Sequence, residues 1–344
     1  MTFTEAKMTT EYRLTTKQID RAIDAMALHL YDYCKASGIH DLIIPESGGL
    51  DSAVTTGAAA YARDMAKMDG YRLDVTAVMI PIESSPDAER LALDVINQFG
   101  VHQIKVEWTE VFRIANGSYD WRALLEHYVE ESRFEHLLND LPRSPVASIN
   151  EQVKEILVKT QNQAALDQWD WSRKVAQGNI KARLRMITAY HIARLMKGLV
   201  LSTDNLSEFW MAFWTICGDV GDFGMIQNVL KGKEMKAFAR RLCVPEEVIN
   251  RKPDADLGIS KNDEDELRAN YDVIDEVMIK LIQVGFDPDG DKNQLNDLPI
   301  IDDYPYELIH SLAERALNGA FKRRGTLNLG REDLGLPHIE DIVL

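Results

Sequence analysis

The chain has 344 residues, of which 45% are apolar and 27% are charged, and its formal net charge is −16 at pH 7. This balance is typical of a soluble globular protein with one large domain or two ordinary ones. The sequence has neither a long apolar run nor a basic-then-apolar start, which argues against a membrane span and secretory export, and its acidic balance argues against binding to nucleic acid or anionic membranes.

The cysteines indicate the compartment. Cys34, Cys217 and Cys243 are odd in number and far apart in sequence. This spacing argues against a disulfide framework and favours a reducing compartment, so we expect the protein in the cytoplasm. The sequence contains no Cys-x-x-Cys pair and no His-x-x-x-His pair, so it predicts no zinc site.

The first third of the chain alternates helical and extended patterns. A capping box at residues 15–18 opens a predicted helix that runs to Ser37, with Gly38 as its stop. Strands are predicted at 41–45, 72–81 and 102–107. Helices are predicted at 53–69 and from Ser85-Pro86 to residue 99, the second with an apolar stripe at helical spacing. Strands alternating with helices in this way indicate βαβ units and a parallel sheet.

The remaining chain is less regular. Residues 116–176 contain helical pieces broken by prolines, and we interpret them as a helical insertion or cover. A helix at 178–197 and a strand at 198–203 follow, and then two helices separated by an acidic loop at 287–303. We therefore expect one α/β domain over 1–344, a doubly wound parallel sheet of about five strands flanked by helices, with a helical C-terminal region and a tail at 325–344.

The strongest motif lies between the first strand and the next helix. There the sequence reads Pro45-Glu46-Ser47-Gly48-Gly49-Leu50-Asp51-Ser52. Two glycines allow a tight turn whose N–H groups approach a ligand, and the start of the following helix favours a phosphate. Ser47 and Ser52 add hydroxyls, and Asp51 offers a carboxylate for Mg²⁺. The loop lacks the Walker lysine, which favours holding pyrophosphate as a leaving group; an ordinary strand-to-helix turn is the alternative.

The string SGGLDS resembles the pyrophosphate loop of the N-type ATP pyrophosphatases. Further blocks follow in order: GNIKARLRMITAYHIA, LVLSTDNLSEFW, GDVGDF, LKGKEMKAFARRL, RKPDADL and NDEDELRANYDVID. Together they resemble the NAD⁺ synthetase family over roughly residues 43–324, with the central insertion outside the match. Several ordered blocks are far more specific than the loop alone.

The resemblance implies roles for individual residues. Asp51 and Glu208 would ligate Mg²⁺, while Arg183, Asp222, Phe321 and Lys322 would bind deamido-NAD⁺. The residues that it assigns to ATP are Pro45, Glu46, Ser47, Gly48, Gly49, Leu50, Asp51, Ser52, Thr203, Lys231 and Asp254. Lys231 and Asp51 would stabilise charge, and no protein nucleophile is required.

The chain also departs from the family pattern. Ser202 replaces a usual glycine, Asp254 replaces a small hydroxyl residue, and Pro45-Glu46 replaces a small, apolar pair. At the dinucleotide side, Ile216 stands where many members have a lysine, and Phe321 stands where a histidine is usual. The GDVGDF block is one residue shorter than the common form, and the role of Asp222 depends on that gap.

The resemblance implies that deamido-NAD⁺ is amidated to NAD⁺ through an acyl-adenylate, with release of AMP and pyrophosphate. No cysteine lies in a recognisable nucleophile setting, so free ammonia is the expected nitrogen donor, and a separate glutaminase partner is the alternative. The family also implies a homodimer. Two other functions stay open: a related ligase with a different carboxylate acceptor, and a non-catalytic nucleotide-binding homologue. The net charge argues against a tRNA-modifying member.

Overall fold

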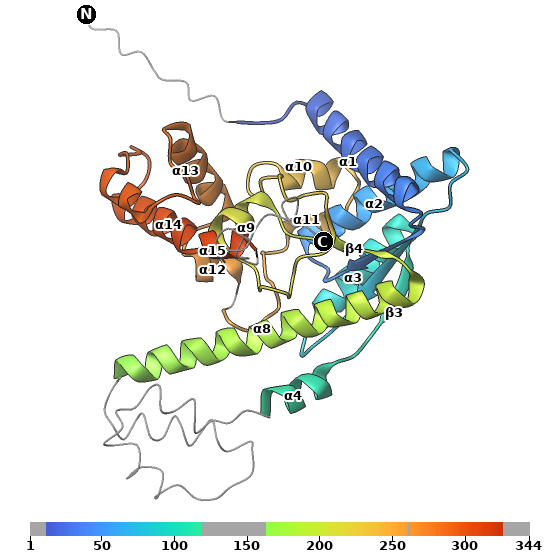
Figure 1. The fold of residues 1–344 in the computed structure, drawn as a ribbon, viewed down its shortest axis with the longest axis horizontal. Coiled ribbons are helices and arrows are strands. Elements are labelled where there is room, and N and C mark those ends of the chain that lie inside the picture. Colours follow the sequence, from blue (N-terminus) through green and yellow to red (C-terminus); the bar gives the residue numbers. More distant parts are fainter. Residues whose placement is uncertain (1–11, 118–162, 261, 326–344) are drawn as a thin grey trace, which may run out of the picture.

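The structure is a computed structural model that describes residues 12–117, 163–260 and 262–325. Its centre is a five-stranded parallel sheet in the order β3-β2-β1-β4-β5. Figure 1 shows the fold and labels two of these strands, β3 and β4. The strands are β1 (Asp41–Pro45), β2 (Asp74–Met79), β3 (His102–Lys105), β4 (Leu199–Ser202) and β5 (Phe223–Gly224). The order changes direction beside β1, so the carboxyl ends of β1 and β4 form the crevice in which ligands of doubly wound sheets bind.

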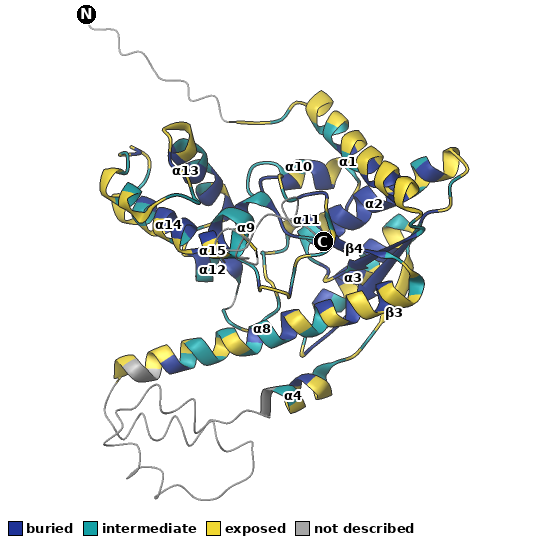
Figure 2. Cartoon of the chain, in the orientation of Figure 1, coloured by how far each residue is buried: buried dark blue, intermediate teal, exposed yellow. Residues whose placement is uncertain are grey.

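Helices cover both faces of the sheet, which explains why β1, β2 and β4 are buried on both sides (Figure 2). On one face, Leu42 and Ile44 pack in the main core with α1 (Thr16–Ser37), α2 (Leu50–Met68), α10 (Met235–Arg241) and α11 (Glu246–Asn250). α3 (Pro86–Phe99) covers β2 on the same side. On the other face, Ile43 packs against α8 (Gln163–Met196) and α4 (Thr109–Gly117).

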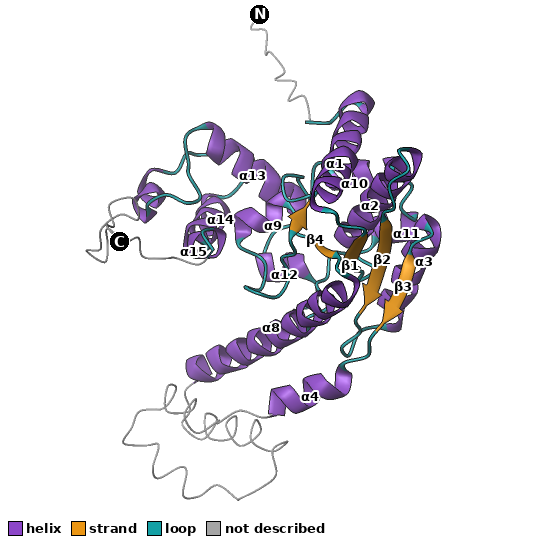
Figure 3. Ribbon diagram, turned by 45° about the vertical axis from the view of Figure 1, so that its right-hand side comes forward, coloured by secondary structure: helices purple, strands orange, loops and turns teal. Residues whose placement is uncertain are grey.

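The C-terminal part forms a second hydrophobic core around α13 (Tyr271–Gln283) and α14 (Tyr306–Asn318). It lies on the opposite side of the molecule from α1 to α3 (Figures 1 and 3). α9 (Leu206–Met211) contacts both α13 and α14. The shorter helices are α12 (Asp263–Leu267), the 3₁₀ helix η2 (Lys292–Asp297) and α15 (Ala320–Arg323). Because α9 directly follows β4, this second core lies beside the crevice of the sheet.

The predicted fold class is confirmed: the sheet is parallel, has five strands and carries helices on both faces. The predicted capping box is also present, because the Thr15 side chain and the Gln18 side chain each bond the other's backbone N–H, and Gly38 ends α1 in the left-handed conformation. In the described residues, no helix is long and apolar enough to cross a membrane.

One predicted helix start is wrong. We expected a helix to begin at Gly178, but α8 begins at Gln163 and continues through that glycine. A Cβ at Gly178 would come within 2.8 Å of Ile259, so the glycine allows close packing inside the helix and does not mark its start. The predicted insertion therefore includes the first turns of α8. The rest of that insertion, residues 118–162, and the tail beyond residue 325 lie outside the described residues.

Candidate functional site

The glycine loop connects β1 to α2 and is held close to α3. Gly48 has φ +73, and a Cβ there would collide with the carbonyl oxygen of Ala88. Only glycine satisfies both the left-handed backbone and this close approach. Gly49 is the N-cap of α2 and has no capping side chain, so the first N–H groups of the helix are not satisfied by a side-chain cap. This local geometry is suited to an anion.

Glu46 lies beneath the loop and is only 3% exposed. Its Oε1 accepts hydrogen bonds from the Gly48 N–H at 2.9 Å and from Ser52 Oγ at 2.6 Å. Its Oε2 accepts one from Thr56 Oγ1 at 2.7 Å. Burial raises the pKa of Glu46, while these hydrogen bonds lower it. The Glu46 side chain therefore holds the loop in position through hydrogen bonds to Gly48, Ser52 and Thr56.

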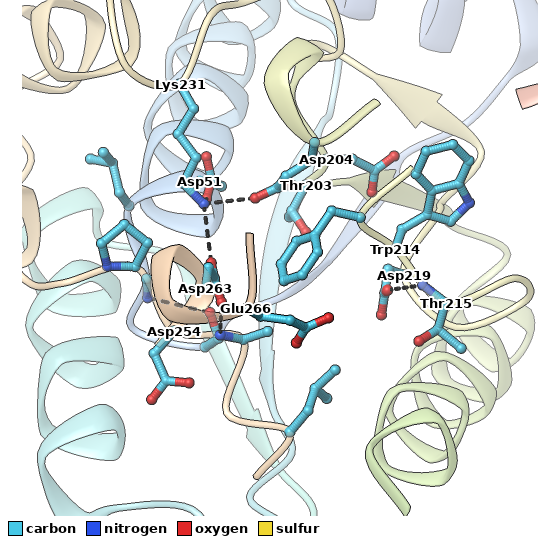
Figure 4. Close-up of a pocket in the computed structure, with 18 of the residues that line it drawn as sticks. Asp51, Thr203, Asp204, Trp214, Thr215, Asp219, Lys231, Asp254, Asp263 and Glu266 are labelled. Carbon is cyan, nitrogen blue, oxygen red and sulfur yellow. Dashed lines mark hydrogen bonds and ion pairs between the residues drawn. The ribbon is translucent and has the colours of Figure 1, made fainter. Parts of the chain in front are cut away.

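Lys231 lies in the centre of a group of acidic side chains (Figure 4). Its Nζ is 2.8 Å from Asp51 Oδ2, 2.7 Å from Glu208 Oε1 and 3.7 Å from Asp263 Oδ2, and it lies 4.4 Å from the ring centroid of Tyr271. Lys231 is 6% exposed. We call these five residues the Lys231 cluster. It joins α2, α9, α12 and α13 through side chains that are far apart in sequence.

The Lys231 cluster contains three carboxyl groups and one ammonium. Burial opposes the charge on Lys231, but the neighbouring carboxylates, Asp51 first, hold its pKa well above the ordinary value. Burial raises the pKa of Glu208 and of Asp263, and Lys231 acts against that shift in both. The ammonium thus keeps its proton and partly neutralises carboxylates that would otherwise repel one another.

Asp275 of α13 fixes the backbone on which Lys231 stands. Its Oδ2 accepts the N–H groups of Gly232 and Lys233 at 2.9 and 3.0 Å, and its Oδ1 accepts the hydroxyl of Ser207. Ser207 Oγ in turn accepts the N–H of Lys231 at 2.9 Å. Burial raises the pKa of Asp275 to about 6. The second hydrophobic core therefore positions the Lys231 cluster through a buried hydrogen-bond network.

A cavity of about 350 Å³ extends from the glycine loop past the Lys231 cluster to a second group of polar residues. At that far end, Asp219 Oδ2 accepts the Thr215 N–H at 2.5 Å, and burial raises the pKa of Asp219 to about 6. Lys322 Nζ donates to the Trp214 carbonyl at 2.6 Å, and the pKa of Lys322 is lowered, chiefly by burial. Figure 4 shows Asp219, Thr215 and Trp214 across the cavity from Lys231 and Asp51.

Most residues assigned to ATP and Mg²⁺ by sequence meet at one end of this cavity. The lining residues among them are Pro45, Ser47, Gly49, Leu50, Asp51, Ser52, Thr203, Glu208, Lys231 and Asp254. Glu46 and Gly48 do not line it, because one lies behind the loop and the other presses against α3. The structure thus brings together residues that are up to about two hundred positions apart in the sequence.

The residues assigned to deamido-NAD⁺ are less concentrated. Lys322 lines the cavity, whereas Arg183, Asp222 and Phe321 do not. Asp222 accepts the Tyr190 hydroxyl at 2.8 Å and the Val200 N–H at 3.2 Å, so it ties α8 to β4. Arg183 is exposed and donates to the carbonyl of Ile216 at 3.2 Å, and Phe321 is 58% exposed. Their predicted binding roles stay predictions.

Sequence reasoning missed several lining residues, including Asp219, Asp263, Glu266 and Trp214. Asp219 stands in the same short block as Asp222, and of these two carboxylates only Asp219 lines the cavity. Asp263 belongs to the quoted block that ends in DVID. Ser202, a departure from the family pattern, donates to the buried Asp204 at 3.1 Å.

The donor set is compatible with Mg²⁺. Asp51 and Glu208 each direct one oxygen to the same point, now taken by the Lys231 ammonium. Mg²⁺ prefers one or two carboxylates together with water and phosphate oxygens. Asp51 and Glu208 can supply the carboxylates, and the remaining ligands would be water and phosphate oxygens. The described residues contain no preformed group of three or more metal-binding side chains.

Comparison with known proteins places the chain among a defined set of relatives. A sequence model of the family described as NAD synthase matches residues 141–325, more than half of the chain. The NH₃-dependent NAD⁺ synthetase of Mesoplasma florum is 29% identical over 313 residues, which are 89% of this chain and 100% of the relative. The enzyme of the same name from Pyrococcus horikoshii is 35% identical over 158 residues, which are 46% of this chain and 58% of the relative.

Two solved structures have the same fold. The NH₃-dependent NAD synthetase from Campylobacter jejuni, in complex with nitrate, has a TM-score of 0.59 at 19% identity, with 91% of this chain and 99% of that chain covered. An NMN synthetase from Francisella tularensis has a TM-score of 0.58 at 20% identity, with 91% and 98% covered. The family match covers the Lys231 cluster except Asp51, together with the far end of the cavity. The chain therefore belongs to the NAD synthase family.

Proposed function

We propose that this chain amidates deamido-NAD⁺ to NAD⁺ with ammonia as the nitrogen donor, converting ATP to AMP and pyrophosphate. The observation that carries the proposal is the single cavity that connects the glycine loop and the Lys231 cluster with Asp219, Trp214 and Lys322. A nucleoside triphosphate fits the end of the cavity beside the glycine loop and the Lys231 cluster. A second substrate with a carboxylate fits the end beside Asp219, Trp214 and Lys322. The names of the relatives support ammonia as the donor.

In this mechanism the nicotinate carboxylate attacks the α-phosphorus of ATP, and pyrophosphate leaves. The acyl-adenylate then reacts with ammonia, which displaces AMP and leaves the amide. The loop between Ser47 and Ser52 holds the departing pyrophosphate, and Lys231 turns from Asp51 and Glu208 towards the phosphates. Mg²⁺, when bound by Asp51 and Glu208, would neutralise charge on the leaving group.

One assay tests the reaction and its acceptor. ATP, Mg²⁺ and ammonium are supplied with deamido-NAD⁺, and AMP and NAD⁺ are followed together; equal amounts of both support the proposal. A parallel reaction contains nicotinate mononucleotide, which keeps the reacting carboxylate but lacks the adenylate half. AMP formed only with that or another acceptor would instead favour a ligase of different substrate, as the departures at Ile216 and Phe321 suggest. Tight ATP binding without AMP would favour a non-catalytic homologue.

We extend the proposal to assembly and location. Three free cysteines support a reducing compartment and thus the cytoplasm. A homodimer is the expected assembly, and α8 offers exposed apolar side chains, Ile187 and Leu195, for such a contact. Light scattering that shows a stable, active monomer would contradict the dimer. If a separate glutaminase is the partner, the chain alone should use ammonium, and glutamine should support activity only when that partner is added.

A further inference from the structure

Glu46 is a buried carboxylate without a cation to balance it. It stands directly after β1 and is 3% exposed. Within the described part of the chain, no lysine, arginine or histidine lies within ion-pair distance of it; its partners are the Gly48 N–H and the hydroxyls of Ser52 and Thr56. Burying a carboxylate beside an anion-binding loop is costly, so a role is required.

The hydrogen bonds of the loop have a fixed direction when Glu46 is ionised. An ionised carboxylate only accepts, so the single hydrogen of the Ser52 hydroxyl must point at Glu46 Oε1, 2.6 Å away. Ser47 Oγ lies 3.2 Å from Ser52 Oγ, and since the Ser52 hydrogen is already used, Ser47 must be the donor of that contact. Ser52 therefore donates to the buried carboxylate and Ser47 donates to Ser52, so both hydroxyl hydrogens are used within the loop.

A bound pyrophosphate reverses this requirement. Phosphate oxygens also only accept, so they need hydroxyl hydrogens that Glu46 currently holds. If Glu46 takes a proton on Oε2, it can donate to Thr56 Oγ1 while Oε1 still accepts the Gly48 N–H. The Ser52 hydrogen is then free to turn towards the cavity, and the Ser47 hydrogen can follow. When Glu46 is neutral, the hydroxyls of Ser47 and Ser52 can therefore donate hydrogen bonds to a phosphate instead of donating within the loop.

From this geometry we infer that Glu46 takes up one proton from solvent when the phosphates of ATP bind to the loop; the inference rests on the proposed function. This proton uptake also removes the repulsion between the Glu46 carboxylate and the bound phosphates. Burial already raises the pKa of Glu46 before any phosphate arrives, and the hydrogen bonds from Ser52, Thr56 and Gly48 oppose this shift. A phosphate anion would raise it further.

The surrounding charges do not supply an alternative partner. They come from α2, α3, α8 and the segment after α11, and they are Asp51, Glu89, Arg185, Arg251 and Asp256. Arg185 pairs with Asp256 at 2.7 Å, and Glu89 pairs with Lys105 at 2.5 Å. Arg251 donates to the Gly48 carbonyl at 3.2 Å. Each cation near the loop is therefore already engaged, and none neutralises Glu46.

The substitution Glu46→Gln tests the inference. A glutamine can present its oxygen to Gly48 and its NH₂ group to Thr56, which copies the protonated carboxyl without needing a proton. Binding of ATP with Mg²⁺, in the absence of an acceptor, is measured by calorimetry in buffers of different ionisation enthalpy. Wild-type protein should take up more protons than Glu46→Gln, by up to about one per site. Its dissociation constant should also rise with pH more steeply, by up to about tenfold per pH unit.

Two further variants complete the test. Glu89→Gln neutralises a neighbouring carboxylate outside the hydrogen-bond chain and should keep the wild-type proton uptake. Thr56→Val removes a donor to the ionised Glu46 from a buried position, so Glu46 should already be protonated more often and the uptake should fall. This variant decides the question if circular dichroism shows that Glu46→Gln does not fold. If Thr56→Val and, where it folds, Glu46→Gln take up as many protons as the wild type, with ATP bound in each, the inference is overturned, whereas wild-type protein that binds no ATP overturns the proposed function.

Discussion

Replacement of Lys231 by methionine should destabilise the protein strongly, although methionine is only one heavy atom shorter than lysine. In the structure the ammonium lies within 2.8 Å of both Asp51 and Glu208 and is 6% exposed. Methionine fills the space but leaves these carboxylates, together with Asp263, without a counter-charge. Breaking a buried ion pair by removing one partner costs about 3–5 kcal/mol, because the remaining charge is uncompensated.

The expected cost depends on pH in a defined direction. Burial already raises the pKa values of Glu208 and Asp263, and loss of Lys231 removes the group that opposes this shift. In the variant these carboxyl groups therefore hold protons to higher pH than in the wild type. The loss of stability should be largest near pH 8 and should shrink as the pH falls and the carboxylates become neutral.

Urea unfolding at pH 8 and pH 5.5 measures this difference. Lys236→Met is the matched control, because Lys236 also lines the cavity but is exposed, and its loss should change the free energy of unfolding by less than about 0.5 kcal/mol. Mg²⁺ should restore part of the stability of Lys231→Met, by about 2.7 kcal/mol at a hundredfold excess over the dissociation constant. A loss below about 1 kcal/mol at pH 8 would refute the placement of the ammonium among the carboxylates.

Three other substitutions test separate parts of the site. Asp51→Ala should slow AMP release from ATP by about two to three orders of magnitude, measured at saturating acceptor, and near-normal turnover would remove the loop aspartate from the mechanism. Gly48→Ala should destabilise the protein by about 2 kcal/mol or more relative to Gly38→Ala in urea unfolding. Both glycines have positive φ, which costs an alanine about 1–2 kcal/mol at either position, but only at Gly48 would the added Cβ also collide with Ala88. Asp275→Asn should remove a pH-dependent loss of stability. Folded Asp275 keeps its proton to about pH 6, whereas the unfolded chain releases it near pH 3.9, so wild-type stability should fall by about 2 kcal/mol as the pH rises from 4 to 7. A difference between Asp275→Asn and wild type that does not change with pH would mean that Asp275 ionises normally.

The local features of this protein follow from the sequence alone. The capping box at Thr15, the stripe of α3 and the glycine loop between β1 and α2 rest on hydrogen bonds and periodicities that span a few residues. Because parallel strands need helical crossovers, the alternation of these patterns also determined the sheet class. Ordered motif blocks then indicated the family before any geometry was known.

Only the tertiary structure decided how the side chains of the site contact one another. Lys231 and Asp51 are 180 positions apart, and only the packing of α13 on the segment after residue 230 brings them together. Asp219 faces the cavity while Asp222 ties α8 to β4, a distinction set by backbone direction and invisible in the spacing of GDVGDF. Glu46 turns inward because three buried donors need an acceptor there. Such contacts depend on long-range packing, which local sequence patterns do not encode.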